Sequence, residues 1–116
     1  MHVSDPLLAR LESAFTDTSD VYVASGLDAP EYFAALEADI RSHVCTPFPL
    51  SATVMPPGFP DFQVGEIVSG HCVAHNAGYW LVYQTDRDAF YCFWGLDPAD
   101  LGAPGVFGSP LYCWSA

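Results

Sequence analysis

The sequence predicts an α+β domain in which two N-terminal helices pack on a mainly antiparallel β-sheet of about four to five strands. The first third holds two amphipathic segments with helix-capping residues. The second half holds short aromatic and β-branched runs that are separated by turn residues. The length of 116 residues, of which 51% are apolar, indicates a single domain, residues 1–116, with its own core.

The first helix is expected to run from Asp5 and Pro6 to about Phe15, with Ser4 as its N-cap. Proline suits this first turn because its fixed φ and missing N–H are tolerated there. The apolar residues that recur at helical spacing are Leu7, Leu8, Leu11 and Phe15. After a polar break, residues 21–24 (Val-Tyr-Val-Ala) predict a short edge strand.

The second helix has the clearer start signal. Asp28 and Glu31 show the three-residue spacing of a capping box, and Pro30 lies at an early helical position between them. The apolar stripe that should face the sheet consists of Phe33, Leu36 and Ile40. These signals predict a helix that packs one face on the sheet and turns its charged residues outward.

The segment after this helix, residues 45–62, contains five prolines. Proline excludes a helix and weakens a central strand, so we expect an extended surface connection with at most an edge strand around residues 51–55. Residues 63–75 then predict a long strand with a break at Gly70.

The clearest structural signal is a β-hairpin made of residues 79–84 and 89–94, joined by the loop Thr85-Asp86-Arg87-Asp88. In each strand, the residues on both faces are apolar. One face of the first strand carries Trp80 and Val82, and the other carries Leu81 and Tyr83; the second strand repeats this with Phe90, Cys92 and Trp94 against Tyr91 and Phe93. We therefore expect both faces of the hairpin to be covered. Asp97 is expected to start a helical turn, and residues 110–115 to form a last apolar strand.

The charge balance limits the classes of partner. Ten Asp and four Glu face three Arg and no Lys, which gives a formal net charge of -11. A surface this acidic repels nucleic acids and anionic membranes and attracts basic partners, mainly by raising association rates. Solubility alone is the competing interpretation of the same charge.

The sequence shows neither the basic start and apolar run of a signal peptide nor an apolar window long enough for a membrane span, so we expect a cytoplasmic protein. Cys45, Cys72, Cys92 and Cys113 stand singly among apolar residues. In a cytoplasmic protein they are expected to be reduced thiols that serve as small core residues.

Two groups of residues, the histidines at 71 and 75 and the cysteines, have side chains suited to metal binding or catalysis. On a strand, His71 and His75 would share one face and offer two imidazoles to a metal, but no closely spaced third ligand accompanies them, so no metal or other cofactor is expected. A cysteine nucleophile needs an electropositive setting, which this acidic chain does not supply. The alternative function is therefore a small enzyme or ligand-binding domain that uses Glu66 together with His71 and His75 on the concave side of the sheet.

Three features, the absence of Lys, the acidic excess and an aromatic content of 15%, make the chain resemble the small acidic immunity proteins that bacteria pair with secreted toxins. In these features it is also similar to some phage-encoded inhibitors. The resemblance implies a non-enzymatic protein that neutralises a basic protein partner such as a toxin. Separately from the resemblance, the chain is expected to be a monomer or a homodimer. A phage-type inhibitor or a nucleic-acid mimic, whose carboxylates imitate phosphates, is the further alternative.

The partner-binding residues are expected in two acidic loops beside aromatic side chains, since aromatic residues are common interface anchors. The predicted set is Asp86, Asp88, Tyr91, Trp94, Asp97, Asp100 and Trp114. The helical carboxylates Glu12, Asp17, Asp20 and Glu37 are expected to lie on an outer solvated face and to contribute less.

Overall fold

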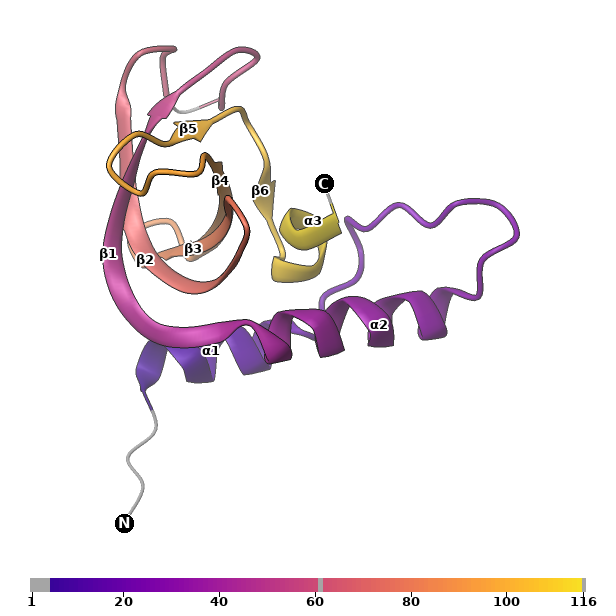
Figure 1. Ribbon diagram of the computed structural model, residues 1–116. Coiled ribbons are helices and arrows are strands. Elements are labelled where there is room, and N and C mark those ends of the chain that lie inside the picture. Colours follow the sequence, from indigo (N-terminus) through magenta and orange to yellow (C-terminus); the bar gives the residue numbers. More distant parts are fainter. Residues whose placement is uncertain (1–4, 61, 116) are drawn as a thin grey trace.

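The computed structural model describes residues 5–60 and 62–115, which form an α+β domain with a mixed sheet (Figure 1). The helices in these residues are α1 (Pro6–Ala14), α2 (Ala29–Ser42) and α3 (Pro110–Ser115). The strands are β1 (Val44–Val54), β2 (Ile67–Asn76), β3 (Tyr79–Gln84), β4 (Ala89–Trp94), β5 (Gly102–Ala103) and β6 (Phe107–Gly108). The α+β class is thus as predicted.

The sheet closes on itself. Its order is β3-β2-β1-β5-β4-β6, and β3 also pairs with β4, so the strands β1 to β5 form a ring. The pairing of β1 with β5 is parallel and the other pairings are antiparallel, so the sheet is mixed. Figure 1 shows how the long, curved β1 follows the wall of this small barrel. Ring closure pairs strand edges that an open sheet would leave free.

The barrel has a core on each side of its wall, as the double-apolar hairpin predicts. The inner cluster includes Leu50, Val54, Val68, Trp80, Val82, Tyr91 and Phe93, all from strands. The outer cluster joins Leu81, Tyr83, Phe90 and Cys92 of the hairpin to Leu11, Ile40 and Leu111 of the three helices. Because successive hairpin residues alternate between these clusters, every second side chain fills the barrel interior and the others pack against the helices.

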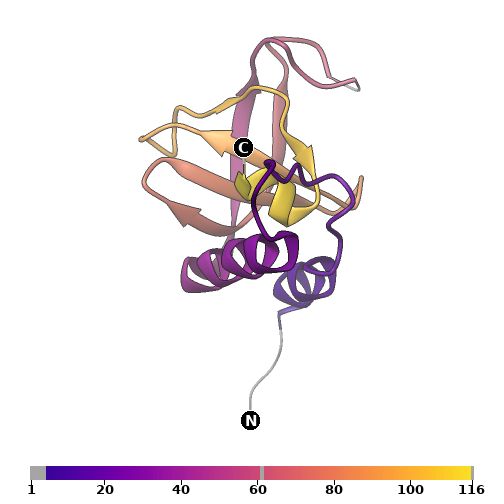
Figure 2. The same cartoon turned by 90° about the vertical axis from the view of Figure 1, so that its right-hand side faces the viewer.

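The two N-terminal helices lie side by side on the outside of the barrel (Figures 1 and 2). Asp28 caps α2 as predicted, with its carboxylate accepting from the Glu31 N–H at 3.0 Å. Helix α1 is capped by Asp5, whose carboxylate accepts from the Leu7 N–H at 2.8 Å. The cap predicted at Ser4 lies outside the described residues.

The expectation of a surface connection after α2 was wrong. The first part of this segment is β1, which lies between β2 and β5. Pro47 is accommodated because the register with β2 shifts between Val44 and Phe48, where a bulge or irregularity frees the chain from regular pairing. Pro49 is paired with His71 of β2, and the other side of β1 pairs with β5 only at Thr53 and Val54, so the missing N–H of Pro49 breaks no pairing with β5. The proline-rich sequence therefore hides a structural strand.

Two short elements also differ from expectation. Residues 110–115 form α3 instead of a strand, because Ser109 accepts from the Tyr112 N–H and Pro110 opens the first turn. The residues 21–24 are irregular instead of an edge strand, with the Val21 N–H bonded to the Thr18 carbonyl. Both segments are short apolar runs whose periodicity does not distinguish helix, strand and loop.

In the described part of the chain, no helix has the length and apolar character needed to cross a membrane.

Candidate protein-binding surface

A row of aromatic rings runs along the end of the hairpin where β3 begins and β4 ends. Trp94 stacks on Tyr79 with ring centroids 6.2 Å apart, Tyr79 meets Trp114 edge-on at 5.8 Å, and Trp114 lies 5.9 Å from the His43 ring. The row forms because Tyr79 and Trp94 are paired across the two strands. It connects exposed Trp94 to the outer core.

The accessible end of this row carries the candidate surface, which we define as Trp94, Leu96, Asp97 and Asp100. Trp94 is 41% exposed and Leu96 is 88% exposed. Asp97 accepts from the Ala99 N–H at 2.9 Å and holds the turn, and the Asp100 N–H bonds to the Asp97 carbonyl. The predicted helical turn at Asp97 is therefore a turn that places two exposed carboxylates next to two exposed apolar side chains.

Two of the predicted anchors lie inside the molecule. Tyr91 is 2% exposed and belongs to the barrel interior, where it stacks on Phe107 and contacts Phe59. Trp114 is 9% exposed, and its indole N–H donates to the Asp39 carboxylate at 2.7 Å. Both side chains serve packing, so Trp94 is the member of the predicted aromatic set that a partner can reach.

Asp88 is engaged within the chain. Its carboxylate accepts from Arg10 Nε at 2.7 Å and from the Tyr83 hydroxyl, and these donors hold the pKa of Asp88 below its usual value, Arg10 most strongly. The residue has φ of 48°, the left-handed conformation that Asp tolerates in turns. Asp88 thus ties the hairpin loop to α1, whereas Asp86 in the same loop is exposed.

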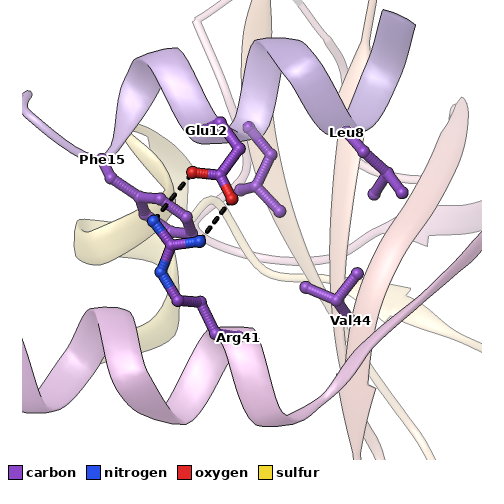
Figure 3. A pocket seen from close by; sticks show the side chains of 6 residues that line it. Leu8, Glu12, Phe15, Arg41 and Val44 are labelled. Carbon is purple, nitrogen blue, oxygen red and sulfur yellow. Dashed lines mark hydrogen bonds and ion pairs between the residues drawn. The ribbon is translucent and has the colours of Figure 1, made fainter. Parts of the chain in front are cut away.

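The arginines are likewise engaged by other groups of the same chain, at its surface. Arg41 makes a two-pronged ion pair with Glu12 and lies 4.7 Å over the Phe15 ring (Figure 3). Arg41 also donates to the Glu37 carboxylate at 3.0 Å. Arg10 pairs with Asp88, and the Arg87 guanidinium lies 4.4 Å over the Phe62 ring. Arg10 and Arg41 thus pair with carboxylates of the same chain, and the net charge of -11 leaves the surface field strongly acidic.

The contacts of Arg41 also define a pocket of about 220 Å³ between α1 and α2, with Leu8, Leu11 and Val44 as its apolar wall (Figure 3). Glu12 and Glu37 are partners of Arg41, so they are not the uncommitted solvated carboxylates that the sequence predicts. The ion pair bridges the helices over this pocket, which makes it a structural feature of the helix layer.

The two predicted acidic loops lie at opposite ends of the hairpin. Gln84 pairs with Ala89 at one end, next to Asp86, and Tyr79 pairs with Trp94 at the other. Five residue steps at about 3.3 Å each separate these ends by roughly 17 Å along the strands. The loops are therefore two separate places on the surface.

The alternative constellation of Glu66, His71 and His75 is not brought together. His71 is paired with Tyr83 of the outer core, and His75 is paired with Trp80 of the inner core and stacks on it at 4.8 Å. The two histidines thus lie on opposite faces of β2, because a register shift between Cys72 and Ala74 breaks the alternation. The expectation of one shared face was wrong.

Glu66 lies outside β2, in the turn before it, and its carboxylate accepts from the Gln63 N–H. Among the described residues, no cluster of three His, Cys, Asp or Glu side chains is arranged to hold a metal ion. The geometry therefore offers these three residues no common site.

The cysteines occupy the core positions that the sequence predicts. Cys72, Cys92 and Cys113 are buried and Cys45 is partly buried, and all four carry free thiols. Burial raises the pKa of Cys92 to about 11 and raises the pKa values of the other three as well. Thiols in such surroundings are poor nucleophiles.

Sequence reasoning missed one residue of the surface and one that supports it. Leu96, a member of the surface, was assigned only to a turn, and Tyr79, on which Trp94 stacks, was assigned only to the strand. A large apolar residue between Gly95 and Asp97, in a turn too short to bury it, was the signal that marks Leu96. Comparison of the chain with protein-family models, with curated proteins and with solved structures gave no significant match.

Proposed function

We propose that the protein is a non-enzymatic acidic binding protein that neutralises a basic protein partner, as an immunity protein neutralises a bacterial toxin. The observation that carries the proposal is the Trp94–Leu96 pair, exposed beside Asp97 and Asp100 on a chain of net charge -11. An aromatic anchor surrounded by carboxylates suits a partner that presents an apolar recess within a basic surface.

The internal pairing of the arginines supports the same function. Because Arg10 and Arg41 are held by carboxylates of the same chain, they do not oppose the approach of a basic partner. Long-range attraction raises the association rate, and close contact at Trp94 lowers the dissociation rate. The acidic field and the exposed anchor thus have complementary parts in binding.

The test is co-expression with the protein encoded by the neighbouring open reading frame. We expect that protein to be basic and toxic when expressed alone, and we expect this chain to restore growth and to co-elute with it. The double variant Trp94→Ala/Leu96→Ser should abolish both effects. The matched control is Tyr22→Ala, because Tyr22 is 80% exposed and lies outside the surface. A neighbour that is neither toxic nor bound, or equal loss in the control, would refute the proposal.

A further inference from the structure

Strand β2 extends beyond its neighbour β3. Residues 67–70 of β2 pair with β1 on one side, from Thr53 opposite Ile67 to Leu50 opposite Gly70. On the other side, pairing with β3 begins only at His71, opposite Tyr83. The first four residues of β2 therefore present an edge that no described strand pairs with, although the rest of the barrel is closed.

Gly70 marks the point where the two strands separate. A Cβ at this position would lie 2.6 Å from the Tyr83 carbonyl oxygen and 2.7 Å from Val82 Cγ1, so only glycine permits this close approach. Beyond it, β3 turns away at Gln84 into the hairpin loop. The divergence opens a groove between the free edge of β2 and the start of that loop.

This groove has a volume of about 500 Å³. Ile67, Ser69, Gly70 and His71 line its β2 side, and Gln84, Thr85 and Asp86 line the side of the loop. Pro49 of β1 and Phe62 complete the lining, so the groove also extends over β2 toward β1. The backbone of β2 beside the loop has no β3 partner before His71, which suits an extended peptide.

The polar groups in the groove include unused acceptors. The side-chain Oε1 of Gln84 is buried without a hydrogen-bond partner, which is costly for an amide oxygen. The carboxylate of Asp86 is exposed, and no hydrogen bond or ion pair within residues 5–60 and 62–115 engages it. The groove therefore favours a ligand rich in donors, such as an arginine or lysine side chain.

We propose that this groove binds an extended, basic segment of the partner protein, which adds as a strand to the free edge of β2 and places a cationic side chain at Asp86. The basic character of the segment rests on the proposed function, whereas the strand pairing rests on the backbone geometry alone. This site lies at the hairpin end opposite to Trp94, so the partner contacts the barrel at two separate places.

The test uses a capped probe peptide in which valine alternates with arginine, together with two N-methylated forms of it. Each form is methylated on alternate residues, and so blocks the hydrogen bonds of one edge of the peptide strand. We expect one methylated form to lose affinity by about tenfold or more and the other to bind like the parent peptide. Amide NMR shifts should be confined to residues 67–71 and 84–86.

The charge requirement is tested with Asp86→Lys and with the matched reversal Asp17→Lys, which lies outside both the groove and the surface around Trp94. We expect Asp86→Lys to weaken peptide binding by about tenfold and Asp17→Lys by about twofold or less. Absence of saturable binding at about 1 mM peptide, equal effects of both methylated forms, or shifts at residues 94–100 would overturn the inference. If the peptide does not bind but the chain still neutralises the toxin through Trp94, the proposed function stands and only the groove proposal fails. If the peptide binds but no toxin is neutralised, only the toxin proposal is refuted.

Discussion

The carboxylate of Asp20 accepts two hydrogen bonds from Ser109, one from its backbone N–H at 3.0 Å and one from its hydroxyl at 2.6 Å. The two residues are 89 positions apart, and Ser109 in turn caps α3. Gly108 precedes it with φ of 136°, and a Cβ there would lie 2.6 Å from the Asp20 carboxylate. This contact fastens the irregular segment between α1 and α2 to the C-terminal helix.

We therefore expect Asp20→Asn to lower the free energy of unfolding by about 1–2 kcal/mol, since one acceptor of the Ser109 N–H and hydroxyl becomes an NH₂ donor and the remaining bond loses its charge assistance. Urea unfolding measures this directly. Asp17→Asn is the matched control, because among the described residues the Asp17 side chain bonds only the nearby Ser19. Equal stability of the two variants would show that the contact with Ser109 contributes nothing.

The ion pair between Arg10 and Asp88 predicts a dependence of stability on pH. Because the pKa of Asp88 is lowered in the folded protein, the carboxylate stabilises the fold above the ordinary aspartate pKa of about 4, and this contribution is lost as pH falls through the lowered value. The urea midpoint of the wild type should exceed that of Asp88→Asn near pH 6, and the difference should shrink toward pH 3. Asn tolerates the left-handed conformation at this position.

Asp86→Asn is the control for this experiment, since Asp86 lies in the same loop without an ion pair. Its midpoint should follow the wild type at every pH. A gap between wild type and Asp88→Asn that is constant from pH 6 to about 3 would mean that the pair with Arg10 does not stabilise the fold.

Thiol reactivity should follow burial. In native protein we expect Cys45, which is partly buried, to react with a disulfide reagent before the three buried cysteines. Unfolded, freshly purified protein should yield all four thiols. Fast reaction of Cys72 or Cys113 in the native state, or the recovery of only half of the thiols, would contradict the core assignment.

Metal content should be insensitive to the histidines. Since His71 and His75 lie on opposite faces of β2, we expect elemental analysis to find no stoichiometric zinc in either the wild type or His71→Ala/His75→Ala. About one zinc per chain that disappears in the double variant would revive the enzyme hypothesis.

Local patterns predicted the hairpin, the cap at Asp28 and the two-sided core, because each depends on residues close in sequence, whereas α1 is capped by Asp5 and not by Ser4. Alternating apolar parity in residues 79–84 placed Trp80 and Leu81 on opposite faces, as found. Barrel closure was not predictable in this way, because it depends on β1 meeting β5, about fifty residues away. The prolines of β1 also carried a misleading local signal.

The same long-range closure explains the mixed result for the site. Sequence parity already separated Tyr91 from Trp94, but it did not say which face closes into the barrel. Because the Tyr91 face is the interior, that side chain is buried, and Trp94 lies on the accessible side. The free edge of β2 could likewise not be predicted from the sequence. It exists because β2 pairs with β1 over more residues than with β3, and these pairings are set only by the fold.

The last prediction separates a specific acidic surface from a general acidic field. Charge reversal of every carboxylate in a region would not separate these two effects, because some carboxylates also hold the fold together. Asp88 pairs with Arg10, Glu12 pairs with Arg41, and Asp20 bonds Ser109. The double reversals Asp97→Lys/Asp100→Lys and Asp17→Lys/Glu31→Lys avoid these contacts and change the net charge equally.

The two pairs of residues are also matched in local structure. Asp97 and Asp17 each make a short-range turn hydrogen bond, whereas no side-chain bond within the described residues engages Asp100 or Glu31. We expect the first double reversal to weaken the complex with the basic partner by about tenfold or more, because its carboxylates flank Trp94 and become desolvated there. The second should reduce mainly the association rate, by an amount that vanishes at high salt. Equal, strongly salt-dependent losses would mean that only the overall field acts, and an unchanged complex after the first reversal would place the interface elsewhere.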